Sequence, residues 1–161
     1  MANNGKAWEQ WESDFAEMVD GRKVRLSGRM ALFKGDVKDD YILADCKYTY
    51  TDSYTLTSDM WDKLSDWARN ESREPVLPIR TCDCELVVVS QPFYYEITDG
   101  SIKPRLNTLT EHKTCKLGFD QSSERPSMFV LGHYKLAAYS CDRFVRDLVD
   151  YEMRASDESQ S

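Results

Sequence analysis

The chain has 161 residues, of which 41% are hydrophobic and 30% are charged. It is long enough for one ordinary domain, and its composition excludes a disordered polyelectrolyte and a membrane protein. The formal charge is −7, from 21 basic and 28 acidic residues, which argues against a protein that coats nucleic acid through a uniformly basic surface. The charge is polarised, however, because residues 21–35 carry five basic residues and no acid, and residues 101–118 carry four basic residues and one acid. Such polarisation can steer a charged ligand.

No apolar run approaches the roughly 20 residues that a membrane-spanning helix needs. The N-terminus lacks the apolar stretch of a secretory signal. The five cysteines are an odd number, so we expect free thiols in a reducing, cytoplasmic compartment rather than disulfides.

The first part of the chain combines one helical and two extended patterns. A helix is predicted over 8–19, where apolar residues recur at three- and four-residue intervals. Residues 23–33 are consistent with a strand interrupted at Ser27-Gly28. The clearest strand is 40–50, which is rich in aromatic and β-preferring residues.

The middle of the chain predicts a second helix followed by two strands. Thr57 begins a run of N-cap side chains for a helix over 59–70, which has an apolar stripe of its own. Short apolar runs at 75–79 and 86–89 have the length of buried strands. This order of elements is typical of one α/β domain with a mixed sheet.

The last part begins with a polar stretch, 91–127, which is punctuated by proline and glycine and is predicted to be a loop-rich insertion. Apolar runs at 128–131 and 136–139 predict a closing hairpin with a Gly-His turn. A final helix is predicted over 142–152. Residues 153–161 are polar and are predicted to form a disordered tail.

Asp36 and the sequence Asp45-Cys46-Lys47 carry the strongest chemical signal. Side chains two apart on a strand share a face, so Asp45 and Lys47 point to one side and their apolar neighbours to the other. If Asp36 lies beside Asp45 on an adjacent strand, the two carboxylates can share a divalent cation. Hard oxygen ligands are those that Mg²⁺ or Mn²⁺ prefers. Lys47 would then orient or activate an attacking water while the metal polarises a phosphate.

This arrangement resembles the PD-(D/E)xK nuclease superfamily, whose signature is an acid, a spacer, and then acid-any-Lys on the next strand. Asp36 and Asp45-Cys46-Lys47 match it, with Gly35 in the place of the proline and aspartate in the place of the commoner glutamate. A helix that carries Glu12 precedes the motif, and an amphipathic helix follows it. That order is similar to archaeal Holliday-junction resolvases and, more closely, to small phage-encoded resolvase-like nucleases. The resemblance covers about residues 8–90.

The resemblance implies a set of site residues. The implied catalytic residues are Glu12, Asp36, Asp45 and Lys47. The implied metal ligands are the carboxylates of Asp36 and Asp45 and the carbonyl of Cys46. Glu9 is the competing choice for the helical acid. Residues that would contact the DNA backbone are Arg25, Ser27 and Arg29.

The fold that the resemblance implies is a restriction-endonuclease-like mixed β-sheet flanked by helices, in a single nuclease domain over 1–152. The implied activity is Mg²⁺- or Mn²⁺-dependent hydrolysis of DNA phosphodiester bonds, with branched or junction DNA as the partner. The chain would act as a phage-type Holliday-junction resolvase in the cytoplasm, that of the host if a phage encodes it.

Resolving a four-way junction requires paired cuts in opposing strands, and one small domain with one site makes one cut at a time. We therefore expect a two-fold symmetric homodimer. Trp61 and Trp67 are six apart in the helix predicted over 59–70, so they cannot share one narrow stripe. One of them is left for a partner or for a buried position under residues 91–127.

The same residues have simpler interpretations. Asp36 follows Gly35 and can be an ordinary turn residue. Asp45 and Lys47 can form an exposed ion pair worth at most about 1 kcal/mol, and Glu12 can be solvated on its helix. Basic residues also often charge an edge strand. The alternatives at the level of function are a catalytically silent DNA- or protein-binding module on the same fold and a repair or restriction-like nuclease.

A zinc site is a separate possibility. Four soft or borderline ligands are available for it, namely Cys82, Cys84, His112 and Cys115. The Cys-x-Cys spacing is tighter than the usual gap of two to four residues, and the chain has one such pair.

Overall fold

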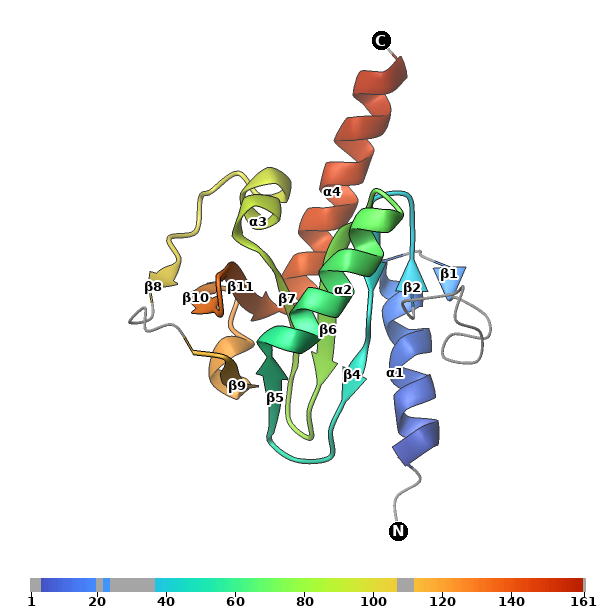
Figure 1. The fold of residues 1–161 in the computed structure, drawn as a ribbon. Coiled ribbons are helices and arrows are strands. Elements are labelled where there is room, and N and C mark those ends of the chain that lie inside the picture. Colours follow the sequence, from blue (N-terminus) through green and yellow to red (C-terminus); the bar gives the residue numbers. More distant parts are fainter. Residues whose placement is uncertain (1–3, 20–21, 24–36, 107–111, 161) are drawn as a thin grey trace.

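The computed structural model describes residues 4–19, 22–23, 37–106 and 112–160, and they form an α/β protein with a mixed β-sheet between helices (Figure 1). The helices are α1 (Asn4–Met18), α2 (Ser58–Asn70), α3 (Gln91–Ile97), α4 (Cys141–Gln160) and the 3-10 helix η1 (Phe119–Gln121). Among these described helices, none is both long enough and apolar enough to cross a membrane.

Nine of the described strands form the main sheet, in the order β1-β2-β3-β6-β7-β11-β10-β8, with β4 also paired to β6. Their bounds are β1 (Arg22–Lys23), β2 (Val37–Lys38), β3 (Ile42–Ala44), β4 (Lys47–Tyr48), β6 (Glu74–Arg80), β7 (Glu85–Ser90), β8 (Arg105–Leu106), β10 (Ser127–Leu131) and β11 (Tyr134–Ser140). A separate two-stranded sheet pairs β5 (Ser53–Thr57) with β9 (Thr114–Gly118). The main sheet is mixed because β3 and β4 run parallel to β6, and β8 parallel to β10, while the other neighbours are antiparallel.

The strand predicted over 40–50 is present as β3 and β4, which keep one register against β6. Ala44 pairs with Val76, and Lys47 pairs with Ile79, so the offset is the same in both. The Asp45 N–H still donates to the Val76 carbonyl (3.1 Å). In a parallel ladder the next donor along β6 is the N–H of residue 78, which is a proline and has none. The ladder is therefore interrupted at this point. Because the register is unchanged, the side chains of β3 and β4 keep their alternation between the two faces of the sheet.

The sheet is buried on both faces, and the apolar runs of its central strands divide between two cores. Val87 and Val89 of β7 pack with α1, α3 and α4, whereas Leu86 and Val88 pack with α2 and the small β5–β9 sheet. The chain thus forms three layers, with α1, α3 and α4 on one side of the sheet. Uninterrupted apolar strands are typical of a sheet covered on both faces.

Two of the predicted elements occur with the local chemistry that predicted them. Thr57 caps α2, and its hydroxyl accepts a hydrogen bond from the Met60 N–H (3.2 Å). The closing hairpin is β10–β11, with Gly132 in the turn at φ 60°. This left-handed conformation is open to glycine at little steric cost.

The prediction of a loop-rich insertion over 91–127 was wrong for much of that stretch, which contains α3, β9 and η1. Ser90 caps α3 by accepting from the Phe93 N–H (3.2 Å), and Pro92 lies in the first turn, where proline is tolerated. β9 pairs with β5 across about sixty residues, a contact that no local pattern reveals.

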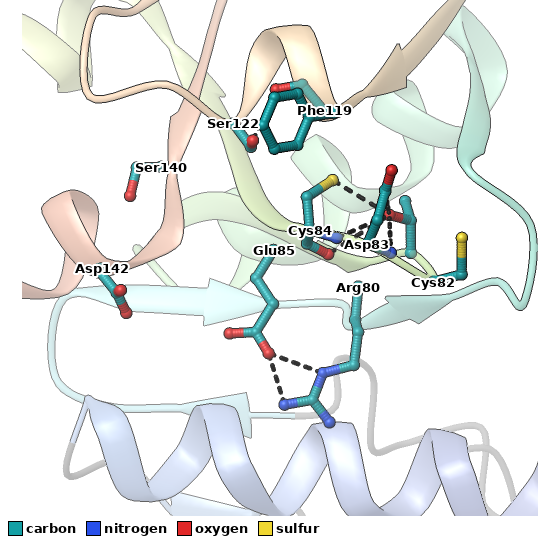
Figure 2. Close-up of a pocket in the computed structure, with 10 residues that line it drawn as sticks. Arg80, Cys82, Asp83, Cys84, Glu85, Phe119, Ser122, Ser140 and Asp142 are labelled. Atoms are coloured by element: carbon teal, nitrogen blue, oxygen red, sulfur yellow. Dashed lines mark hydrogen bonds and ion pairs between the residues drawn. The ribbon is translucent and has the colours of Figure 1, made fainter.

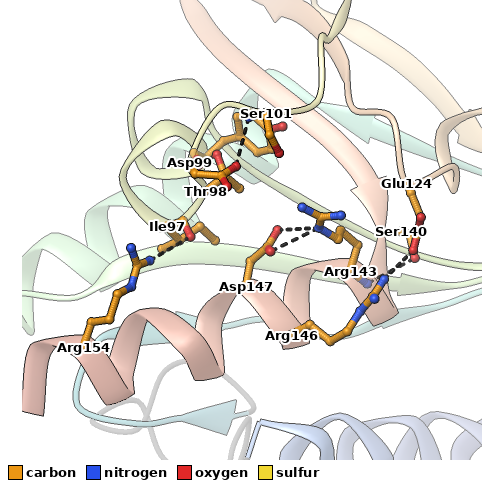
Figure 3. Close-up of polar contacts among 11 residues, drawn as sticks. Ile97, Thr98, Asp99, Ser101, Glu124, Ser140, Arg143, Arg146, Asp147 and Arg154 are labelled. Atoms are coloured by element: carbon orange, nitrogen blue, oxygen red, sulfur yellow. Dashed lines mark hydrogen bonds and ion pairs between the residues drawn. The ribbon is translucent and has the colours of Figure 1, made fainter.

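The prediction of a disordered tail was also wrong for the described residues beyond 152, because α4 continues to Gln160. The chain has no glycine or proline after Gly132 to stop the helix. Figure 3 shows the contact that holds this part against the body, in which Arg154 Nη2 donates to the carbonyl of Ile97 at the end of α3 (3.5 Å). Near the start of α4, Arg143 Nε donates to both carboxylate oxygens of Asp147, which lies one turn further along the helix (3.1 and 3.2 Å).

Candidate functional site

The Asp45–Lys47 pair is the centre of the candidate site. Strand alternation puts both side chains on one face, and their neighbours Ile42, Ala44 and Cys46 are buried in the opposite core, on the α1 side. Lys47 Nζ lies 3.2 Å from Asp45 Oδ2, and the two side chains are 23% and 17% exposed. The pair is therefore partly shielded from water, and the predicted arrangement on one face is the one observed.

Trp8 of α1 contacts the site at β4. Its indole Nε1 donates to the carbonyl of Cys46 (2.9 Å), and its ring centroid lies 5.9 Å from Lys47 Nζ. The implied role of the Cys46 carbonyl as a metal ligand must be compatible with this hydrogen bond. A carbonyl oxygen has two lone pairs and can accept from more than one group. The sequence analysis assigned Trp8 to an apolar stripe and missed this contact.

Glu12 and Glu9 differ in their surroundings on α1. Glu12 is half-buried and lies one helical turn beyond Trp8, on the side of the helix that reaches Cys46. Glu9 is exposed. Of the two acids, Glu12 therefore lies on the side of α1 that carries Trp8.

Tyr54 of β5 faces the pair from the small sheet. Burial raises the pKa of Tyr54, the charge of Lys47 lowers it, and that of Asp45 raises it, which places the phenol within electrostatic range of both. The Tyr54 hydroxyl has a weak contact with Met60 Sδ (4.0 Å). No motif in the sequence pointed to Tyr54, because it reaches the site only through the β5–β9 layer.

Arg80 of β6 ties α1 to the end of the sheet. Its Nη2 contacts Asp14 of α1 (2.9 Å) and Glu85 of β7 (2.6 Å), and the guanidinium lies 4.3 Å from the ring centroid of Trp11. The hydrogen bonds from Gln10 and Arg80, together with the charge of Arg80, hold the pKa of Asp14 below its usual value against the opposing effect of burial. These contacts fix the helix that carries Trp8 and Glu12.

A cleft of about 560 Å³ opens beside Arg80, at the β6–β7 turn and the start of α4 (Figure 2). Its charged lining consists of Arg80 and three acids, Asp83, Glu85 and Asp142. Neither Asp45 nor Lys47 lines it. An acidic cleft repels a phosphate backbone, so this hollow does not suit DNA, although large concave pockets are the usual places for ligands.

The zinc alternative requires Cys82, Cys84, His112 and Cys115 to meet. All four are described, and nowhere in the described ranges do three His, Cys, Asp or Glu side chains gather as a metal-binding group. Burial raises the pKa of the Cys115 thiol to about 12. Cys84 instead contacts the Thr81 hydroxyl (3.1 Å). A thiol held in its neutral form is a poor zinc ligand, and the structure gives this alternative no support.

Asp36, Arg25, Ser27 and Arg29 lie outside the described residues. The described chain resumes at Val37, whose partner across the β2–β3 ladder is Ala44, the residue before Asp45. Of the predicted site residues, the structure thus places Glu12, Asp45, Cys46 and Lys47. Comparisons with protein-family models, with curated proteins and with solved structures found no match to this chain.

Proposed function

We propose that the chain is a Mg²⁺- or Mn²⁺-dependent endonuclease that hydrolyses DNA phosphodiester bonds, of the Holliday-junction resolvase type. The observation that carries the proposal is the Asp45–Lys47 ion pair on one face of the strand that follows Asp36 and β2. The resemblance to the PD-(D/E)xK superfamily rests on the same residues.

The order of the elements around the pair supports the proposal. α1 precedes an antiparallel β1-β2-β3 unit, and α2 then leads to β6, which runs parallel to β3. This is the order expected for the signature, with a helix that carries an acid, an acid before one strand, the acid-any-Lys sequence on the next strand, and a helix before the following strand. The strand that begins at Val37 pairs with the strand that ends at Ala44, so the chain positions after Asp36 and before Asp45 are neighbours.

The donors at the site are suited to a hard cation. The carboxylates of Asp45 and Asp36 and the carbonyl of Cys46 would hold Mg²⁺, with Glu12 reaching it directly or through water. Described residues alone provide no group of three acidic, His or Cys ligands, so the site depends on Asp36. When bound, the metal supplies polarisation of the phosphate and stabilises negative charge on it.

Lys47 acts in this proposal as a positioned, charged donor. Its ammonium is held 3.2 Å from Asp45 and lies over the Trp8 ring, 5.9 Å from the ring centroid. A cation fixed in this way can orient an attacking water and offset the charge that develops on the phosphate. Its effect is therefore expected on the rate of cleavage more than on the affinity for DNA.

Basic residues lie in the layer that covers this face. Lys113 precedes β9, Lys116 lies within it, and both are exposed. β9 pairs with β5, the strand that carries Tyr54. This places exposed positive charge on the layer next to the Asp45–Lys47 pair, in a chain whose total charge is −7, and it favours approach of the DNA backbone from this side.

The test is cleavage by the full chain with Mg²⁺ or Mn²⁺ of a panel that contains a four-way junction, nicked duplex, single-stranded DNA and linear duplex. We expect the junction to be cut, and Asp36→Asn or Asp45→Asn to abolish cutting while the fold remains. Asp52→Asn, which removes an exposed acid outside the pair, is the matched control and should leave cutting unchanged. Binding without cleavage by the wild type would establish the silent binding module instead, and cleavage restricted to linear duplex would favour a repair or restriction-like nuclease.

Separate variants distinguish rate from affinity. Lys47→Ala should reduce the cleavage rate with little loss of DNA affinity. Arg25→Ala and Arg29→Ala should weaken binding and lower the salt dependence by about one unit each. If Lys47→Ala only weakened binding, Lys47 would be a phosphate contact and the proposed role would be wrong.

We also propose that the active form is a two-fold homodimer, because paired cuts in a junction require two sites. Light scattering should then report about twice the chain mass of 18.7 kDa. A strict monomer that cuts junctions symmetrically would contradict the dimer.

A further inference from the structure

A small cavity at the opposite end of the sheet from the β6–β7 turn has a lining unlike that of the rest of the molecule. It has a volume of about 230 Å³ and lies where the β2–β3 and α2–β6 connections meet α3 and α4. Three aromatic rings line it, those of Tyr41, Phe93 and Tyr151. Its charged lining consists of three acids, Asp40, Glu74 and Glu96, and of Arg73. Neither Asp45 nor Lys47 takes part.

The three rings form one connected cluster. The Tyr41 and Tyr151 centroids are 5.6 Å apart with an interplanar angle of 74°, and those of Phe93 and Tyr151 are 6.5 Å apart at 87°. Because each pair meets edge to face, the rings are inclined to one another instead of stacking flat. The negative face of an aromatic ring attracts a cation.

Among the described residues, neither Glu74 nor Glu96 forms an ion pair with a basic side chain. Burial raises the pKa of Glu74, and the neighbouring charge of Glu96 raises it further. Glu96 accepts a hydrogen bond from the Tyr151 hydroxyl (2.6 Å). The nearest arginine, Arg73, also borders the cavity, but its guanidinium is engaged elsewhere.

The guanidinium of Arg73 contacts Asp39 and Glu71. Its Nε donates to the Asp39 carbonyl (2.5 Å), its Nη1 donates to the Glu71 carbonyl (3.4 Å), and the same nitrogen is 3.7 Å from the Glu71 carboxylate. Glu74 and Glu96 thus share a partly enclosed, aromatic-walled space, and the one arginine at its border is engaged by Asp39 and Glu71.

We propose that this cavity binds a compact organic ammonium group, either a lysine side chain of a partner or a free small cation. The rings supply cation–π attraction, and Glu74 and Glu96 supply the charge. A divalent metal fits less well, because the described residues contain no group of three His, Cys, Asp or Glu side chains that could hold a metal ion, and aromatic walls cannot coordinate one. The proposal does not depend on nuclease activity.

The decisive experiment compares choline with 3,3-dimethylbutan-1-ol, its uncharged isostere, by NMR titration of the full chain. We expect choline to bind about tenfold or more tightly than the alcohol, with shifts at α3 and α4. Equal binding of the two would overturn the proposal, because it would make the cavity a plain apolar pocket, and so would binding of neither. Preferential binding of Mg²⁺ that Glu74→Gln removes would overturn it in favour of a metal site.

Variants locate the site. Glu74→Gln and Tyr41→Leu should each weaken choline binding several-fold. Tyr95→Leu, which removes an exposed ring on α3 that does not line the cavity, should leave it unchanged. Thermal unfolding of each variant separates loss of the site from loss of the fold, and an unchanged affinity in folded Glu74→Gln and Tyr41→Leu would overturn the assignment.

A second titration identifies the source of the cation. Butylammonium and a short peptide with one lysine present the same ammonium group, and the same peptide with acetyl-lysine lacks the charge. Tighter binding of the lysine peptide than of butylammonium supports a protein partner, and equal binding supports a free cation. Binding of the acetylated peptide as tightly as the lysine form would contradict both.

Discussion

Replacing Arg80 by methionine removes one guanidinium while keeping most of the aliphatic stem that packs on α1. Arg80 contacts Asp14 and Glu85 with side chains that are 24%, 30% and 32% exposed, and it lies 4.3 Å from the Trp11 centroid. Partly exposed ion pairs contribute at most about 1 kcal/mol each, and a cation–π contact about 0.5–1 kcal/mol. The sum is a loss of about 1–3 kcal/mol in the free energy of unfolding.

For a chain of this length, that loss corresponds to a fall in Tm of about 2–12 °C. The assay is thermal and urea unfolding of Arg80→Met against the wild type at neutral pH. Arg69→Met is the matched control, because Arg69 and Asp66 form an ion pair with side chains 74% and 66% exposed, for which the expected change is below about 0.5 kcal/mol.

A double-mutant cycle isolates the contact with α1. Arg80→Met and Asp14→Asn share one interaction, so the effect of the double variant should be smaller than the sum of the two single effects. If Arg80→Met were no more destabilising than Arg69→Met, or if the two changes were additive, Arg80 would not hold α1 against the sheet. The reasoning about the position of Trp8 and Glu12 would then fail.

Three further predictions follow from single contacts. Trp8→Phe removes the indole donor to the buried Cys46 carbonyl and should lower the free energy of unfolding by about 1–2 kcal/mol, as urea denaturation would reveal; an unchanged midpoint would contradict that hydrogen bond. The pKa of Asp14 is lowered in the folded chain, so its contribution to stability is present above its unfolded pKa of about 4 and is lost as pH falls through the folded pKa. In acid, the free energy of unfolding of Asp14→Asn should therefore depend less steeply on pH than that of the wild type, and equal slopes would refute this. Cys82 is exposed, whereas burial raises the pKa of Cys115 to about 12, so a maleimide at pH 8 should modify Cys82 first and Cys115 slowly. The fast phase of modification should be lost in Cys82→Ser, and a fast phase that persists in this variant would contradict the prediction.

The local chemistry of the sequence determined the elements whose causes lie within a few residues. The two-residue period of a strand placed Asp45 and Lys47 on one face and Cys46 on the other, as observed. Thr57 marked the start of α2 through its cap, and the Gly-His turn marked the hairpin. In each case a side chain or backbone angle within the segment specifies its conformation, so tertiary contacts were not needed to predict it.

Contacts between distant segments decided the rest. Trp8 reaches the Cys46 carbonyl across 38 residues, and β9 pairs with β5 across about sixty to bring Tyr54 over the Asp45–Lys47 pair. The cavity of Tyr41, Phe93 and Tyr151 joins residues from three parts of the chain. Pairing and packing of this kind depend on which surfaces remain unburied after the elements have formed. That is a property of the whole assembled sheet, and it leaves no local period in the sequence.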